Sequence, residues 1–224
     1  MPESIMIFTA GKGTRMAPLT DTMPKPMIPV NGKPLADYAY ALAQQEKLRT
    51  VMNIHYLPDQ LVAHFQDTNV IFSDERDELL ETGGGLRKAL PLLGDDAVFT
   101  LNSDVVWSGP NPLSVLRAEW DPDKMDALLL LLPVEQALGR SGQGDFSCLE
   151  TGQITRGGPL LYTGAQIIKT HRLSEIPETA FSLNLYWNLL MKSGRVFGHR
   201  YSGKWCDVGQ PESLPIAEAL VADV

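Results

Sequence analysis

Short apolar runs alternate with amphipathic segments through the first 133 residues, and this alternation constrains the fold more than any other feature of the chain. Apolar runs that predict buried strands lie at residues 5–8, 50–55, 70–73, 97–101 and 127–133. Apolar side chains recur at helical spacing at residues 34–42, 58–65, 83–93 and 113–119. Strands that alternate with helices form a mostly parallel sheet with helices on both faces. We therefore expect an α/β fold with a doubly wound, Rossmann-like sheet.

The second half of the chain is less regular. Its expected elements are extended segments near residue 146 and at 160–168, a helix at 182–192, strands that complete the sheet at 195–201 and 204–208, and a closing helix at 211–221. A length of 224 residues with 44% hydrophobic content suits one substantial core. We expect a single domain over residues 1–224.

Composition excludes several classes of protein. A net charge of −8 argues against a nucleic-acid partner, so any phosphate site needs a local concentration of cations and backbone amides. The longest apolar run, at residues 127–133, is too short to cross a membrane, and the N-terminus lacks the pattern of a secretion signal. The two cysteines, Cys148 and Cys206, indicate neither a disulfide framework nor a zinc site. These features favour a cytoplasmic protein without a membrane partner.

The expected first strand runs directly into a loop that concentrates glycines and cations. Gly11 and Gly13 let backbone N–H groups approach phosphate oxygens, while Arg15 and Lys25 can offset the charge that develops as pyrophosphate leaves. A flexible surface loop with solvated cations is the alternative for such a short pattern. The dinucleotide-binding pattern GxGxxG is incomplete because Met16 replaces its third glycine, and the Walker pattern is absent.

The full string from residue 9 to residue 27 closely resembles the signature of the sugar-1-phosphate nucleotidyltransferase family, a strand followed by AGxGTRxxPLT and then PKP. The resemblance implies that the loop wraps the triphosphate of a nucleotide and that Arg15 and Lys25 contact phosphate as catalytic residues. The loop residues that carry this implied role are Ala10, Gly11, Gly13 and Thr14. Thr9 stands where the family usually has alanine.

Two aspartates lie in segments that could hold a metal. Asp104 follows the strand expected at residues 97–101, where it could cap a helix or bind a cation, and Asp207 lies far away in the sequence. The family carries one metal-binding aspartate in an NxD segment and another in a late WxDVG segment. The resemblance therefore implies that Asp104 and Asp207 together bind Mg²⁺, although Ser103 replaces the usual glycine.

Three further segments resemble substrate-binding parts of the family. Thr82 and Gly83 belong to a second glycine-rich loop, whose backbone would read the nucleobase edge, and Thr82 could at the same time cap the helix that begins there. Implied contacts to the sugar phosphate come from Asn102, Asp145, Thr163 and Gly164. Asn184 is a further candidate, with a solvent-facing helical position as the alternative.

The resemblance implies a magnesium-dependent enzyme that transfers a nucleotidyl group from a nucleoside triphosphate to a sugar 1-phosphate and releases pyrophosphate. Residues 1–133 would form the nucleotide half and residues 134–224 the sugar-phosphate half. Compact size and the motifs resemble bacterial N-acetylmuramate 1-phosphate uridylyltransferases most closely, and we expect no C-terminal β-helix. A mannose-1-phosphate guanylyltransferase, a phosphocholine cytidylyltransferase and an inactive nucleotide-sugar-binding regulator stay open, and a Rossmann oxidoreductase is disfavoured by Met16. We expect a monomer or a small homo-oligomer.

Overall fold

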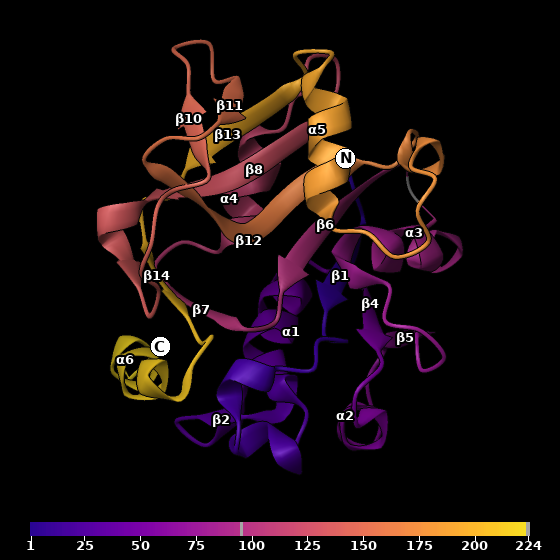
Figure 1. Ribbon diagram of the computed structural model, residues 1–224, viewed down its shortest axis with the longest axis vertical. Helices are drawn as coiled ribbons and strands as arrows, with labels where there is room; N and C mark the ends of the chain where they lie inside the picture. Colours follow the sequence, from indigo (N-terminus) through magenta and orange to yellow (C-terminus); the bar gives the residue numbers. More distant parts are fainter. Residues whose placement is uncertain (95, 223–224) are drawn as a thin grey trace.

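The computed structural model describes residues 1–94 and 96–222, and a large twisted sheet runs through its centre (Figure 1). The strands of this sheet are β1 (Ser4–Phe8), β4 (Arg49–Ile54), β5 (Ile71–Asp74), β6 (Ala97–Asn102), β8 (Ala127–Pro133), β10 (Phe146–Cys148), β11 (Ile154–Arg156), β12 (Leu160–Lys169) and β13 (Val196–Arg200). Their order is β11-β10-β12-β6-β1-β4-β5, and β8 pairs with both β12 and β13.

Parallel pairing dominates the N-terminal side of the sheet. Strand β1 lies between β4 and β6 and is parallel to both, and β5 is parallel to β4. The chain therefore crosses to one side of β1 to form β4 and later to the other side to form β6, which makes the carboxyl end of β1 a topological switch point. Strand β12 is antiparallel to β6 and β8, while β13 is parallel to β8. The expected α/β fold with a mostly parallel sheet is confirmed.

Helices cover both faces of the sheet. The main helices are α1 (Leu35–Gln45), α2 (Pro58–His64), α3 (Glu81–Leu93), α4 (Pro112–Glu119), α5 (Leu183–Met191) and α6 (Leu214–Leu220). Alternate residues of β8 explain why its sequence is apolar throughout: Leu128, Leu130 and Leu132 share a core with α1, α2 and α4, whereas Leu129 and Leu131 share one with α3 and α5. Every strand and helix expected over residues 5–133 is present, with ends that differ slightly.

The expectation that residues 204–208 complete the main sheet is wrong. Strand β14 (Lys204–Asp207) instead pairs antiparallel with β7 (Val105–Ser108) and parallel with β9 (Ala137–Leu138) in a separate small sheet. The two sides of β14 explain the difference, since Trp205 faces the core beneath α1 and Cys206 faces a third apolar cluster beneath α6. The small sheet thus joins two cores, close to α6 in Figure 1.

Short elements complete the structure. A two-stranded hairpin joins β2 (Pro29–Val30) to β3 (Lys33–Pro34). The 3-10 helices are η1 (Thr14–Met16), η2 (Leu19–Asp21), η3 (Lys25–Met27), η4 (Val134–Gln136), η5 (Leu173–Glu175) and η6 (Pro211–Ser213). Within residues 1–94 and 96–222, none of the helices has both the length and the apolar character that crossing a bilayer requires.

Candidate active site

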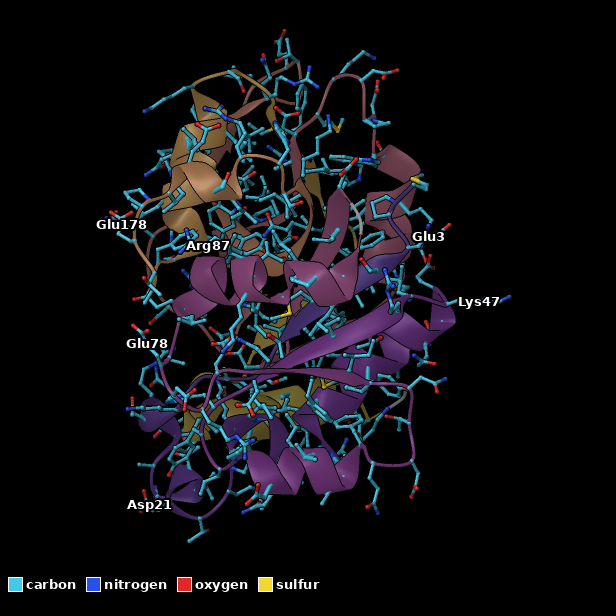
Figure 2. The ribbon with its side chains drawn as sticks, turned by 90° about the vertical axis from the view of Figure 1, so that its right-hand side faces the viewer. Glu3, Asp21, Lys47, Glu78, Arg87 and Glu178 are labelled. Carbon is cyan, nitrogen blue, oxygen red and sulfur yellow. The ribbon has the colours of Figure 1, made fainter. Side chains whose placement is uncertain are left out.

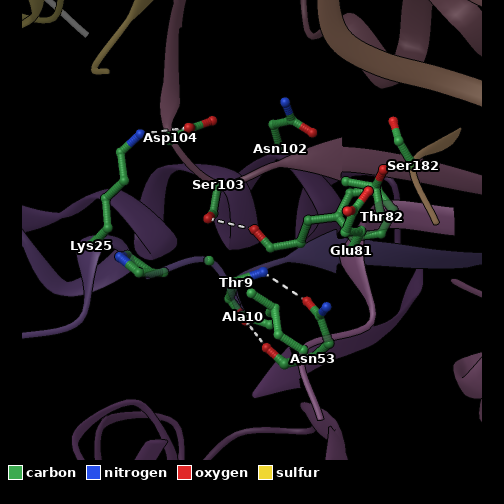
Figure 3. Close-up of a pocket in the computed structure, with 14 residues that line it drawn as sticks. Thr9, Ala10, Lys25, Asn53, Glu81, Thr82, Asn102, Ser103, Asp104 and Ser182 are labelled. Atoms are coloured by element: carbon green, nitrogen blue, oxygen red, sulfur yellow. Dashed lines mark hydrogen bonds and ion pairs between the residues drawn. The ribbon is translucent and has the colours of Figure 1, made fainter. Parts of the chain in front are cut away.

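A pocket of about 380 Å³ opens at the switch point of the sheet. Three of its residues, Phe8, Asn53 and Asn102, come from the carboxyl ends of β1, β4 and β6. The other residues that line it are Thr9, Ala10, Gly11, Lys25, Pro26, Leu79, Glu81, Thr82, Ser103, Asp104 and Ser182. Figure 3 shows Lys25 and Asp104 at one side of this pocket and Glu81, Thr82 and Ser182 at the other.

The glycine-rich loop folds back onto Lys25. Ala10 and Gly11 line the pocket, and Gly13 lies just beyond them with a left-handed φ of 62°. A Cβ atom at Gly13 would lie 2.8 Å from the Cβ of Lys25, and the Thr20 hydroxyl donates to the Gly13 carbonyl at 3.0 Å. Only glycine satisfies both the backbone conformation and this close approach, so Gly13 fixes the loop beside Lys25.

Lys25 and Asp104 form an ion pair at the edge of the pocket. Their Nζ and Oδ2 atoms are 2.6 Å apart, and the Lys25 side chain is only 10% exposed. A lysine that has lost most of its water needs a charged partner, and Asp104 supplies it. The ion pair holds the Lys25 ammonium group at the pocket. It uses only the Oδ2 atom of Asp104, so the Oδ1 atom can bind another ligand.

Asp207 ends strand β14, and Asp104 lies in the turn that directly precedes the neighbouring strand β7. Asp207 lies opposite Val105 in the β7–β14 pairing, and the Val208 N–H donates to the Asp104 carbonyl at 2.9 Å. Burial raises the pKa of Asp207, and the negative charge of Asp104 raises it further. The positive charges of Lys25, Arg140 and Arg15 lower the pKa of Asp207 and so partly oppose this rise.

The chemistry of this carboxylate pair suits a divalent cation that takes its remaining ligands from water and substrate. Among the described residues, no group of three or more histidine, cysteine or acidic side chains gathers as a metal site. Two carboxylates suffice for Mg²⁺, because this ion usually keeps several waters and takes further oxygens from substrate phosphates. Asp104 and Asp207 would hold such an ion, which stays a prediction.

A buried polar network supports the pocket from below. The Thr9 N–H donates to the Asn53 Oδ1 atom at 2.8 Å, and the Thr9 hydroxyl donates to the Asn53 carbonyl. The Asn53 amide in turn donates to Glu75 Oε1 at 2.8 Å. Glu75 is fully buried, and this burial raises the pKa of its carboxyl group. Thr9, which departs from the family pattern, therefore ties the end of β1 to β4.

The second glycine-rich loop lies partly at the pocket and partly in the packing of α3. The N–H groups of Gly83 and Gly84 donate to the Phe181 carbonyl at 2.8 and 3.1 Å, so Gly83 is engaged in packing rather than open to a nucleobase. Thr82 does line the pocket, but it lies within α3 and its hydroxyl accepts from the Leu183 N–H at 3.0 Å. The interpretation of Thr82 as a helix cap is therefore wrong, because α3 begins earlier, at Glu81.

The segment that leads into α5 is held against α3. Arg87 donates to the carbonyls of Ile176 at 2.6 Å and Thr179 at 3.2 Å, and also to that of Glu178. Figure 2 shows Arg87 beside Glu178 at this junction. Because the segment then continues to Ser182, these bonds fix the wall of the pocket that Ser182 supplies.

A second cavity of about 270 Å³ continues from the first and shares Thr82, Asn102 and Ser182 with it. Its other lining residues are Arg140, Asp145, Arg156, Tyr162, Leu183, Asn184 and Trp187. Asp145 accepts from the Tyr162 N–H at 2.9 Å through one oxygen and lies 3.6 Å from Arg140. Asn102 and Asp145, two of the residues expected at the sugar phosphate, therefore line this cavity.

Thr163 and Gly164 lie in a β-bulge of strand β12. The buried Thr163 hydroxyl donates to the Leu130 carbonyl at 2.7 Å, so this side chain serves the sheet and does not reach the cavity. Gly164 has a φ of 90°, and a Cβ atom there would lie 2.9 Å from the Cβ of Asn102. Gly164 therefore acts by leaving room for Asn102.

Arg15 and Thr14 lie in η1, which follows the pocket-lining part of the glycine loop. Both side chains are exposed, and the charge of Arg15 acts on Asp207. Asn53, Arg140 and Arg156 also line the cavities but were not predicted from the sequence. Asn53 ends a buried strand and could have been found from that position, whereas nothing in the local sequence distinguishes the two arginines.

Comparison with known proteins extends over nearly the whole chain. Residues 5–166 match the family model of the MobA-like NTP transferase domain. The chain is 35% identical to the N-acetylmuramate alpha-1-phosphate uridylyltransferase of Caulobacter vibrioides, over 99% of this chain and 98% of that protein. It is 32% identical to the protein of the same name from Neisseria meningitidis, over 96% of each.

Solved structures share the fold. A putative glucose-1-phosphate thymidylyltransferase from Bacillus anthracis gives a TM-score of 0.81, with 20% sequence identity over 99% of this chain and 96% of that chain. At this level of identity the similarity concerns the arrangement of sheet and helices. It agrees with the central sheet and its flanking helices described above.

Proposed function

This chain belongs to the family of sugar-1-phosphate nucleotidyltransferases with a MobA-like NTP transferase domain, and from that premise we propose that it transfers UMP from UTP to N-acetylmuramate 1-phosphate. The family resemblance seen in the sequence motifs is thereby confirmed, as is the enzyme class. The identity of the base, the identity of the sugar and the use of Mg²⁺ belong to the proposal. A nucleoside triphosphate substrate fits the cytoplasmic location expected from the sequence.

One observation carries the proposal: the ion pair of Lys25 with Asp104 lies beside Asp207 at the switch-point pocket that the glycine-rich loop borders. A triphosphate requires backbone amides and cations, and the acceptor phosphate requires a place next to its α-phosphorus. The N-acetylmuramate substrate is proposed from the names of the two relatives that align over nearly their full length.

The proposed reaction is an in-line attack of an acceptor phosphate oxygen on the α-phosphorus, with pyrophosphate as the leaving group. Such a transfer depends on positioning and charge stabilisation, so it needs no protein nucleophile. Lys25 and Arg15 would offset the charge on the departing pyrophosphate, and the ion pair with Asp104 would hold Lys25 in place. Mg²⁺, when bound by Asp104 and Asp207, would neutralise phosphate charge and orient the reacting groups.

We further propose that residues 1–224 act as one domain, with nucleotide contacts from residues 1–133 and acceptor contacts largely from residues 134–224. The two contiguous cavities support this division, because Lys25 and Asp104 line the first and Arg140, Asp145 and Arg156 line the second. Asn102 borders both and would lie near the junction of the two substrates.

Pyrophosphate release tests the proposal directly. We expect release with UTP, N-acetylmuramate 1-phosphate and Mg²⁺, and loss of release when the metal is removed with a chelator and recovery when Mg²⁺ is returned. GTP, CTP and dTTP, with mannose, glucose and N-acetylglucosamine 1-phosphates and phosphocholine, complete the panel. Release with GTP and mannose 1-phosphate alone would replace the proposed substrates. Triphosphate binding without release in any combination would favour the inactive regulator.

A further inference from the structure

Among the described residues that line the second cavity, Arg156 is a cation held by several neighbours. Its guanidinium group lies 4.9 Å from the centre of the Phe146 ring and 5.5 Å from that of Trp187. Its Nε donates to Asn188 at 2.9 Å, and its two terminal nitrogens donate to the side-chain and main-chain oxygens of Asn184 at 2.9 and 3.0 Å. The aromatic rings and the two asparagines therefore fix the plane and direction of the group.

This arrangement leaves hydrogen-bonding capacity unused. A guanidinium group has five N–H donors, and the bonds to Asn184 and Asn188 use three of them within the described part of the chain. One N–H then remains on each terminal nitrogen of Arg156. Each of these N–H groups can donate to a carboxylate oxygen, and the positive charge of the group strengthens such a hydrogen bond.

The net charge of the residues that line the second cavity also favours an anionic ligand. Among the described residues that line it, the charged ones are Arg140, Arg156 and Asp145, so two positive charges stand against one negative charge and the sum is +1. Asp145 lies 3.6 Å from Arg140 and also accepts from the Tyr162 N–H. Arg156 thus keeps a charge that no single acidic neighbour pairs directly among the described residues.

The phosphate of the acceptor has to meet the nucleotide in the first cavity, beside Lys25 and Asp104. The cations of the second cavity therefore face the non-reacting part of the sugar, where a neutral hexose offers only hydroxyl and amide groups. We propose that Arg156, assisted by Arg140, binds a carboxylate carried by the acceptor sugar and so selects acidic sugar 1-phosphates over neutral ones. This inference rests on the proposed function and names the residues that would decide its acceptor.

The experiment is a competition in one reaction between N-acetylmuramate 1-phosphate and N-acetylglucosamine 1-phosphate, which differ by the carboxylate-bearing ether. The ratio of the two products reports the ratio of kcat/KM values and does not depend on how much of the enzyme is folded. We expect the wild type to favour the acidic acceptor, and Arg156→Gln to lower that preference about 100-fold with turnover of the neutral acceptor retained.

Two further variants sharpen the test. Arg156→Lys keeps the charge but loses the planar group that the asparagines and aromatic rings orient, so we expect it to keep only part of the preference. Arg140→Gln should lower the preference less than Arg156→Gln does. Arg172→Gln is the control, because Arg172 pairs with Glu175 outside both cavities, and it should leave the product ratio unchanged.

The possible results separate the inference from the function on which it rests. An unchanged product ratio in Arg156→Gln would overturn the role of Arg156 while leaving uridylyl transfer to N-acetylmuramate 1-phosphate established. A wild-type enzyme that uses both acceptors equally would also overturn it, since no selection would exist to explain. If the wild-type enzyme forms no product from UTP with either acceptor, the proposed function and this inference are both overturned.

Discussion

Lys25 shows how single residues prepare the pocket before any substrate binds. Its side chain is only 10% exposed, so the ammonium group has lost most of its hydration and relies on Asp104 at 2.6 Å. Gly13 restricts the lysine further, because the loop passes too close to its Cβ to admit a side chain. The result is a cation with a fixed position, which is what stabilisation of a developing negative charge requires.

Replacement of Asp104 by asparagine tests this residue. Asp104→Asn keeps the shape but removes the charge that pairs with Lys25 and would bind the metal, so we expect kcat to fall by at least about 100-fold with the fold intact. The measurement is pyrophosphate release with saturating substrates, together with circular dichroism. Asp121→Asn is the control, since Asp121 also pairs with a lysine, Lys124, at 2.8 Å but lies outside both cavities. Unchanged turnover in folded Asp104→Asn would remove Asp104 from the proposed machinery.

At the scale of elements, the bulge in strand β12 connects the sheet to the site. Between Tyr162 and Gln166 the pairing with β8 shifts its register, and Gly164 lies in the shifted part. A regular strand would present a side chain against Asn102, whereas the bulge and its glycine leave that space open. The position of Asn102 at the end of β6, where it borders both cavities, thus depends on the bulge in the neighbouring strand β12.

Gly164→Ala tests this dependence. The new methyl group would lie 2.9 Å from Asn102 and the backbone would be strained at a φ of 90°, so we expect kcat/KM to fall at least about tenfold and stability to fall by about 1 kcal/mol or more. Steady-state kinetics and urea unfolding measure the two effects.

The matched control for Gly164→Ala is Gly32→Ala in the β2–β3 hairpin. Gly32 has a similar left-handed φ of 75°, but a Cβ atom there would meet nothing within 4 Å. This variant should lose stability through backbone strain and retain activity. Equal losses of activity in the two variants would show that the contact with Asn102 is not what matters.

At the scale of the whole molecule, separate elements meet at a buried carboxyl group. Glu75 follows β5, accepts from Asn53 at the end of β4 and from the Leu80 N–H just before α3, and is fully buried. Gly85 of α3 packs so closely that a Cβ atom there would lie 2.7 Å from Glu75 Oε1. The position of the pocket wall therefore depends on a group whose ionised form is poorly solvated.

Glu75 should make the stability of the protein depend on pH. Burial raises its pKa in the folded protein above the ordinary value of 4.5, so the folded state holds the proton more tightly than the unfolded state does. Glu75 therefore favours folding below about pH 4.5, and this contribution is lost as pH rises through the folded pKa. We expect the stability of Glu75→Gln relative to wild type to increase as pH rises from 4 to 7.

Urea unfolding of both proteins at several pH values measures this difference. Glu78→Gln provides the control, because Glu78 belongs to the same loop and is exposed. Its stability should run parallel to that of the wild type. A constant difference between Glu75→Gln and wild type across the range would show that Glu75 has the same pKa in the folded and unfolded states.

The sequence by itself determined the strands and helices of residues 5–133, the class of the sheet and the family to which the chain belongs. These features are encoded locally, because apolar periodicity sets each element and the glycine loop with Lys25 places phosphate-binding groups a few residues apart. The end of β6 and the end of β1 meet because parallel strands bring their carboxyl ends to one edge of a sheet.

The tertiary structure alone decided which distant segments meet. The pairing of β14 with β7 brings Asp207 beside Asp104, packing against Phe181 occupies the N–H of Gly83, and the rings of Phe146 and Trp187 orient Arg156. Each of these contacts joins residues far apart in the chain, and their free energy depends on burial and pairing that exist only once the sheet and helices have packed. The motifs around Asp104 and Asp207 implied that these two residues meet only through the family resemblance, and no local pattern of residues predicts the other contacts.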